Sequence, residues 1–140
     1  MKVEGGCHCG AIAFEAEIHP DNVSICHCTD CQTLSGAPYR ASVAVKGENL
    51  KFTRGTPRIY VKTADSGNKR AQGFCGDCGS PIFSTSTDDK PALYMVRAGS
   101  IKQRDELVPK FQIWQSSAQP WTAHVADIPL HTGGLPPYKL

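Results

Sequence analysis

Seven cysteines, arranged in three groups, are the residues of this 140-residue sequence best suited to chemistry. The groups have the spacings C-x-C, C-x-C-x2-C and C-x2-C, and they comprise Cys7 and Cys9, then Cys26, Cys28 and Cys31, then Cys75 and Cys78. Thiolates this close in sequence can surround a single zinc ion. The C-x2-C pair is followed at once by Gly79, which is typical of a zinc knuckle. We therefore expect a zinc protein.

The number of cysteines suggests how they divide. Seven is odd, so pairing into disulfides would leave one thiol over. Four thiolates make a closed structural zinc site, whereas three leave a position for water or substrate, as in catalytic sites. We infer two zinc ions per chain: a catalytic one on Cys26, Cys28 and Cys31, and a structural one on Cys7, Cys9, Cys75 and Cys78. Other partitions exist, and a simpler alternative is that both sites only stabilise the fold.

Two histidines lie between paired cysteines. Successive side chains of an extended segment point to opposite faces, so His8 and His27 should face away from a metal bound by their neighbours. The rival interpretation is that one of them replaces a cysteine as a ligand. His27 could also orient a thiolate or handle a proton near the open site.

Composition and charge exclude several classes of function. The net charge is +2, from 15 basic and 13 acidic residues, and no basic cluster suggests a nucleic-acid partner. No stretch approaches the roughly 20 apolar residues of a membrane-spanning helix, and the first residues lack the apolar part of a signal peptide. We expect a cytoplasmic protein without membrane partners, in which clustered cysteines bind metal or catalyse.

Alternating segments predict a mainly β fold in a single domain over residues 1–140. Isoleucine, phenylalanine and alanine alternate with glutamate over 11–18, and similar patterns predict strands over 39–46, 49–53, 57–62, 70–74, 81–86, 92–98 and 110–115. Residues 29–35 form the one plausible helical turn. The stretch 127–140 is rich in proline and glycine, so we expect it to be surface coil.

The cysteine motifs and their surroundings resemble a known family. The segments GGCHCGAIAFE, CHCTDCQTLSGAPY and FCGDCGSPIF are similar to those of the glutathione-dependent formaldehyde-activating enzyme family, with centromere protein V as a distant relative. VRAGSIKQ and FQIWQSSAQPW also resemble family positions. The resemblance runs from Gly5 to about Trp121 in the expected order.

The resemblance implies a fold, a reaction and the roles of the cysteines. The fold would be an Mss4-like β-tent of several antiparallel sheets stapled by zinc. The activity would be that of a carbon–sulfur lyase, combining glutathione and formaldehyde reversibly as S-hydroxymethylglutathione. In the family, the C-x-C and C-x2-C pairs hold the structural zinc and the C-x-C-x2-C motif holds the catalytic one, which matches the division inferred from the count.

Two other functions stay open at this point. One is a non-enzymatic, zinc-binding interaction module of the Mss4-like type, and the other is a thiol redox protein using Cys28 and Cys31. If the chain is an enzyme, Arg40, Arg97 and Lys102 could meet the carboxylates of a thiol such as glutathione, although isolated cations are usually solvated. Asp30 could hydrogen-bond a nearby backbone or substrate group, but we favour a turn residue. Trp114 and Trp121 could cover the sheet or the mouth of the site, but we favour packing in an aromatic core.

Overall fold

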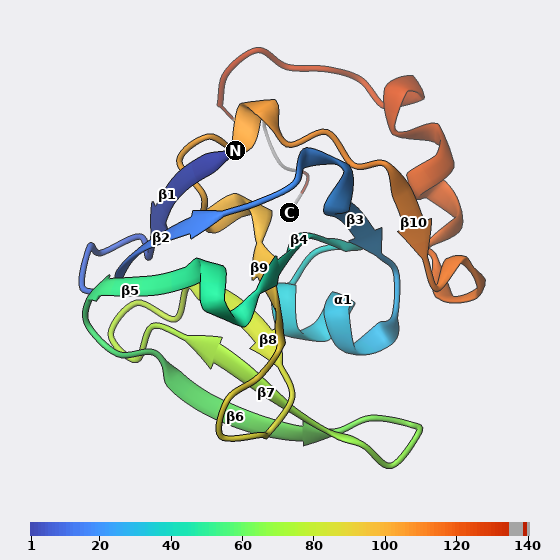
Figure 1. The fold of residues 1–140 in the computed structure, drawn as a ribbon. Coiled ribbons are helices and arrows are strands. Elements are labelled where there is room, and N and C mark those ends of the chain that lie inside the picture. Colours follow the sequence, from blue (N-terminus) through green and yellow to red (C-terminus); the bar gives the residue numbers. More distant parts are fainter. Residues whose placement is uncertain (135–138, 140) are drawn as a thin grey trace.

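The alternating segments form strands in two sheets, in a computed structural model that describes residues 1–134 and 139. The described chain is mainly β, as predicted, with one short α-helix, α1 (Thr29–Ser35), and several 3-10 turns. Figure 1 shows α1 lying beside β4 (Arg40–Lys46), a strand of the larger sheet.

The smaller sheet is antiparallel and has the order β1-β2-β5. Its strands are β1 (Lys2–Gly6), β2 (Ala13–Glu17) and β5 (Leu50–Arg54). Phe14 and Ala16 are buried whereas Glu15 and Glu17 are exposed, which is the alternation expected of a half-buried strand.

The larger sheet has seven strands in the order β10-β3-β4-β9-β8-β7-β6. They are β3 (Val23–Cys26), β4 (Arg40–Lys46), β6 (Arg58–Thr63), β7 (Lys69–Phe74), β8 (Pro81–Thr85), β9 (Leu93–Arg97) and β10 (Phe111–Ile113). Neighbours pair antiparallel, except that β10 runs parallel to β3. A parallel pair needs a long connection, and here most of the sheet intervenes between the two strands.

Two strands, β1 and β3, form where none was predicted. β1 ends in Gly5 and Gly6, and glycine is depleted in strands. Gly5 is nevertheless suited to its place, because a Cβ there would lie 2.2 Å from Phe14 Cζ and 2.5 Å from the Ser100 carbonyl oxygen. β3 runs directly into the middle cysteine motif, which obscured its short apolar pattern.

The core lies between the two sheets. Fully buried side chains of the small sheet, such as Phe14, pack in one cluster with Val43, Ile82 and Val96 of the large sheet. A chain of aromatic contacts crosses the interface, from Phe14 to Phe52 at 6.1 Å and from Phe52 to Phe83 at 5.9 Å between ring centroids. Burying side chains of this size contributes roughly 1.5–3 kcal/mol each.

The other face of the large sheet is polar and also buried. Ser42 pairs with Arg97 across β4 and β9, and Gln72 pairs with Ser84 across β7 and β8. All four have 8% or less of their surface exposed. Directly opposed residues of a ladder share a face, so a layer of polar side chains lies on the face away from the core.

The C-terminal segment follows the large sheet's edge strand β10. The 3-10 segment η6 (Pro120–Asp127) includes Asp127, the first residue of the predicted coil, and residues 128–134 form no regular element. Residues 135–138 and 140 of the predicted coil lie outside the described residues. The expectation that Trp114 and Trp121 pack in the core is wrong: they are 61% and 48% exposed, and both follow the edge strand β10. No described helix is long and apolar enough to cross a bilayer.

Candidate metal centres and the cleft beside them

Four cysteines from two distant turns meet at one place. Cys7 and Cys9 lie in the turn between β1 and β2, and Cys75 and Cys78 lie in the turn between β7 and β8. Their sulfurs all lie within 4.8 Å of one another. The Cys7 and Cys9 sulfurs are 3.6 Å apart, and those of Cys9 and Cys75 are 3.8 Å apart. The structure thus brings together the four residues predicted as a closed set.

The sulfur spacing fits a tetrahedral zinc ion. Zinc–sulfur bonds of about 2.3 Å in a tetrahedron place the sulfurs about 3.8 Å apart. The measured separations of 3.6 and 3.8 Å agree with this spacing. No histidine or carboxylate of the described residues joins the group. The donor set is therefore four thiols, which suits zinc better than magnesium or calcium.

Ser80 links the two turns that carry this cluster. Its hydroxyl oxygen accepts a hydrogen bond from the His8 backbone N–H at 3.0 Å and lies 3.2 Å from the Cys78 sulfur. The Ser80 hydroxyl, donating to that sulfur, lowers the pKa of Cys78 to about 5. The Cys7 sulfur accepts a hydrogen bond from the Ile12 N–H at 3.2 Å. These donors favour the thiolate form, which is the form that binds metal.

Gly79 makes the tight turn after Cys78. Its φ is +75°, a left-handed conformation that glycine adopts without strain. Its N–H donates to the Cys75 carbonyl at 2.8 Å, and the Cys75 N–H donates to the Ser80 carbonyl at 2.9 Å. The backbone thereby curls beneath the two sulfurs, as the C-x2-C-G pattern predicts.

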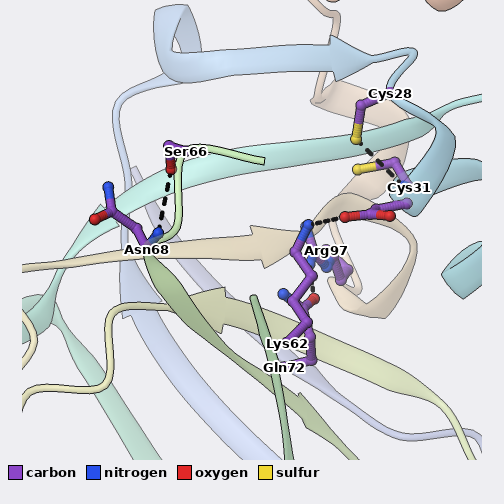
Figure 2. Close-up of polar contacts among 8 residues, drawn as sticks. Cys28, Cys31, Lys62, Ser66, Asn68, Gln72 and Arg97 are labelled. Atoms are coloured by element: carbon purple, nitrogen blue, oxygen red, sulfur yellow. Dashed lines mark hydrogen bonds and ion pairs between the residues drawn. The ribbon is translucent and has the colours of Figure 1, made fainter. Parts of the chain in front are cut away.

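A second cluster forms where β3 passes into α1. Cys26 is the last residue of β3, Cys28 caps the N-terminus of α1, and Cys31 lies in its first turn. Their three sulfurs lie within 4.8 Å of one another, and all three residues are partly buried. The Cys28 sulfur accepts the N–H of Cys31 at 3.3 Å, a contact drawn in Figure 2. No further histidine, carboxylate or thiol of the described chain joins this group.

The thiols of this cluster influence one another. A hydrogen bond from the Cys31 thiol lowers the pKa of Cys26, although burial acts against it. The same bond, together with burial, raises the pKa of Cys31 well above its ordinary value. One thiolate is thus stabilised by its neighbour even without a metal ion, and three thiolates together would need a cation between them.

His27 turns away from the sulfurs on either side of it. It is 2% exposed, its Nε2 lies 2.7 Å from the Gln112 side-chain oxygen, and its ring packs edge-on against Tyr39 at 5.4 Å. Its backbone N–H donates to the Ile113 carbonyl at 3.0 Å, extending the pairing of β3 with β10. His27 therefore anchors the cysteine loop to the edge of the sheet.

Two polar contacts fix α1 in place. The side-chain amide of Gln32 donates to the His27 carbonyl at 2.8 Å and to the Ser117 carbonyl at 2.9 Å. Asp30, in the first turn of α1, forms an ion pair with Lys62 of β6, and Figure 2 shows where Lys62 lies. Asp30 is therefore more than the turn residue expected, since it ties the metal loop to a strand far along the chain.

Arg40 and Arg97 lie beneath this loop and are 7% and 8% exposed. Arg97 donates to the Ser42 hydroxyl at 2.9 Å. It also donates to the Gln72 side-chain oxygen at 3.0 Å, as Figure 2 shows. Burial, followed by repulsion from Arg40, lowers the pKa of Arg97 to about 9, whereas the Cys31 and Cys26 thiolates raise it. Burial lowers the pKa of Arg40 too, and the thiolates of all three cysteines oppose that change. Both guanidiniums remain charged at neutral pH.

A cleft of about 770 Å³ is lined in part by these two arginines. Its lining includes Tyr39, Ser35, Cys7 and His8, and it holds five cations, Arg40, Arg54, Arg97, Lys102 and Arg104, against two carboxylates, Glu4 and Glu15. One of these cations is already neutralised, since Lys102 pairs with Glu4 at 2.9 Å. The cleft is therefore cationic, which suits an anionic ligand.

Sequence reasoning identified the cysteines but not the depth of the arginines. Arg40, Arg97 and Lys102 were singled out, and all three line the cleft. Only Lys102 is solvated, with 69% of its side chain exposed. Within β4, Arg40 and Ser42 alternate with the positions of Val43 and Val45 and so lie on the opposite face, which was the available signal for a polar face.

The chain resembles proteins of one family along most of its length. The family model described as glutathione-dependent formaldehyde-activating enzyme matches residues 2–117. A protein of Halomonas elongata, named "Putative glutathione-dependent formaldehyde-activating enzyme", is 28% identical over 88 residues, which cover 59% of this chain and 55% of that protein. The chain thus spans about half the length of this curated relative.

A solved structure has a similar fold. A crystal structure of a Rhodobacter sphaeroides protein matches 78% of this chain and 98% of its own, with a TM-score of 0.59. The sequence identity is 20%. At that identity the likeness concerns the fold alone, and it supports the mainly β architecture described above.

Proposed function

Since this chain belongs to the glutathione-dependent formaldehyde-activating enzyme family, we propose that it is a zinc-dependent carbon–sulfur lyase acting on thiol–aldehyde adducts. The reaction we infer joins glutathione, or a similar small thiol, to formaldehyde as S-hydroxymethylglutathione. The thiol sulfur bonds to the aldehyde carbon, and the thiol proton ends on the former carbonyl oxygen. The reverse step breaks the same carbon–sulfur bond.

One observation carries the proposal: three sulfurs lie within 4.8 Å of one another and no fourth ligand of the described chain completes the set. We infer that Cys26, Cys28 and Cys31 hold a catalytic zinc ion and that Cys7, Cys9, Cys75 and Cys78 hold a structural one. A zinc ion with an open position supplies charge stabilisation, favouring a thiolate and polarising an aldehyde oxygen.

The protein's own residues would hold the substrate and the metal loop. Cys28 and Gln32 fix the start of α1, so the three sulfurs keep their positions as ligands exchange. The exposed cations Arg54 and Arg104 of the cleft would attract the carboxylates of a peptide-like thiol. Glutathione has two carboxylates, and the excess of positive charge in the cleft suits them.

We place this chemistry in a single domain in the cytoplasm. The core cluster contains residues of both sheets, which supports one folding unit. All seven cysteines are free thiols, as a reducing compartment would keep them.

Metal analysis and exchange measurements test the proposal together. Purified protein should contain two zinc ions per chain, and NMR exchange between glutathione, formaldehyde and their adduct should become faster with added protein. Cys31→Ser should lose this acceleration, whereas Asp89→Asn, a change at an exposed turn residue away from both clusters, should keep it. Two bound zinc ions without any acceleration would reject the lyase and favour the alternative function of a zinc-binding interaction module.

A further inference from the structure

Arg40 and Arg97 are the charged side chains that the described structure buries most deeply, apart from the histidine ring of His27. We propose that this arginine pair makes the three-cysteine centre select an anionic fourth ligand, a thiolate, over a neutral one. The inference rests on the proposed function in one respect, because it takes the three cysteines to hold a divalent metal ion.

Strand register places the pair on the same side of the sheet as the cysteines. Arg40 stands opposite Cys26 in the ladder of β3 and β4, and Ser42 stands opposite Arg97 in the ladder of β4 and β9. Opposed residues share a face, and so do residues two apart on a strand. Cys26, Arg40 and Arg97 therefore all lie on the polar face, beneath the loop that carries the other two cysteines.

The hydrogen bonds of Arg97 go to neutral partners. Arg97 donates to Ser42 and Gln72, and its Nε has no partner among the described residues. Neither arginine takes part in an ion pair with a carboxylate of the described residues, and Asp30 of the metal loop pairs with Lys62 instead. Burying a charge without an anion costs several kcal/mol. The cysteine thiolates are the anions that can offset this cost.

Formal charges show what the site lacks. Three thiolates around a divalent ion leave a charge of minus one, and the two guanidiniums bring the buried group to plus one. A neutral fourth ligand leaves that excess in place, whereas a thiolate cancels it. In a weakly polar environment this difference in net charge makes the site bind a thiolate much more tightly than a neutral ligand.

The competing role for the pair is to bind a substrate carboxylate. Their burial argues against it, since Arg54 and Arg104, which are exposed, offer cations in the same cleft at a smaller cost of desolvation. We therefore assign the buried pair to the ligand of the metal, and the accessible cations to the substrate's carboxylates.

Binding of simple thiols to the Co²⁺-substituted protein separates the two roles. Two probes are titrated at one pH: 2-mercaptoethanol, which has no carboxylate, and mercaptoacetate, which has one. Binding is followed by the sulfur-to-cobalt charge-transfer absorption, and metal content is measured first. The variants are Arg97→Met and Arg40→Met, with Lys102→Met as the matched control and Arg97→Lys and Arg40→Lys to keep the charge.

If the proposal holds, Arg97→Met and Arg40→Met weaken the binding of both thiols by about tenfold or more and to the same extent. The lysine variants recover most of that affinity, and Lys102→Met leaves 2-mercaptoethanol unaffected. The methionine variants are compared at equal cobalt content and with unchanged circular dichroism. Should one of them fail to fold, the other arginine carries the same test.

Three results would overturn the proposal. They are a loss confined to mercaptoacetate, an affinity unchanged in both methionine variants, and failure of the three-cysteine site to take up cobalt. The readout is ligand binding and not turnover, so the outcome is independent of whether the protein accelerates adduct formation. A chain with the predicted thiol binding but no lyase activity would reject the proposed reaction and keep this inference.

Discussion

The two cysteine clusters differ in how far along the chain they reach. The four-cysteine cluster joins the turn after β1 in the small sheet to the turn after β7 in the large sheet, and Cys9 and Cys75 are 66 positions apart. The three-cysteine cluster is local, with Cys28 and Cys31 only 3 positions apart. One cluster connects the two sheets, and the other shapes a single loop.

This difference in reach predicts a difference in stability. By the chain-entropy estimate used for disulfides, linking residues 66 positions apart restricts the unfolded chain by roughly 4 kcal/mol, whereas linking near neighbours gives roughly 2 kcal/mol or less. A metal at the first cluster therefore acts mainly on folding. A metal at the second can exchange a ligand with less effect on the fold.

Their surroundings differ as well. Neutral donors, the Ser80 hydroxyl and the Ile12 N–H, approach the four-cysteine sulfurs. The buried guanidiniums of Arg40 and Arg97 lie near the three-cysteine cluster. Their positive charges attract the negative charges of its thiolates. Electrostatic arrangements of this kind are typical of sites that do chemistry.

Cys78→Ser should give the largest effect of all. It removes a ligand from the cluster that joins the sheets, and structural zinc contributes roughly 10–16 kcal/mol in small zinc domains, as much as the whole stability of a typical domain. We expect the variant to lose its cooperative thermal transition and its protection from proteolysis. Circular dichroism and limited trypsin digestion measure both.

Cys31→Ser should separate activity from stability. The loop loses one ligand while the link between the sheets stays intact, so we expect one zinc ion per chain, a melting temperature lowered by only a few degrees, and activity reduced at least about 100-fold. Metal analysis, calorimetry and the NMR exchange measurement provide the three values. If Cys31→Ser proved more destabilising than Cys78→Ser, the roles assigned to the two clusters would have to be exchanged.

Local features of this molecule were readable from the sequence, and long-range ones were not. The alternation in 39–46 and the cysteine spacing predicted β4 and both groups of thiols, because each depends on neighbours along the chain. The burial of Arg40 and Arg97 depends on the register of β3, β4 and β9 and on the helix above them. The exposure of Trp114 likewise depends on β10 being an edge strand, which no local pattern specifies.

Gly79→Ala and Gly36→Ala compare the same backbone strain at the two clusters. Their φ angles are +75° and +65°, and an added Cβ meets no atom within 4 Å at either position. Each alanine should therefore cost roughly 1–2 kcal/mol through its left-handed backbone alone. Similar losses in unfolding free energy are expected from denaturant titrations.

The clusters should respond differently to those two substitutions. Gly79 follows a ligand of the four-cysteine cluster directly, whereas Gly36 ends α1 beyond the three-cysteine loop. We expect Gly79→Ala to speed release of the tightly held zinc to a chelator, and Gly36→Ala to leave that slow phase unchanged. Equal release rates would show that the knuckle turn does not help to hold the metal.

Lys62→Met should give the smallest effect and test how firmly the three-cysteine loop is tied to β6. The Lys62 side chain is 19% exposed and that of its partner Asp30 is 50% exposed, so their pairing should contribute only about 0.5–1 kcal/mol. A double-mutant cycle with Asp30→Asn isolates this coupling from the unfolding free energies.

The matched control is the pair Lys102 and Glu4, at 69% and 56% exposure, which should show weaker coupling. Equal coupling in both pairs would mean that Lys62 is only a surface contact, and that Gln32 and His27 alone hold the metal loop to the sheet.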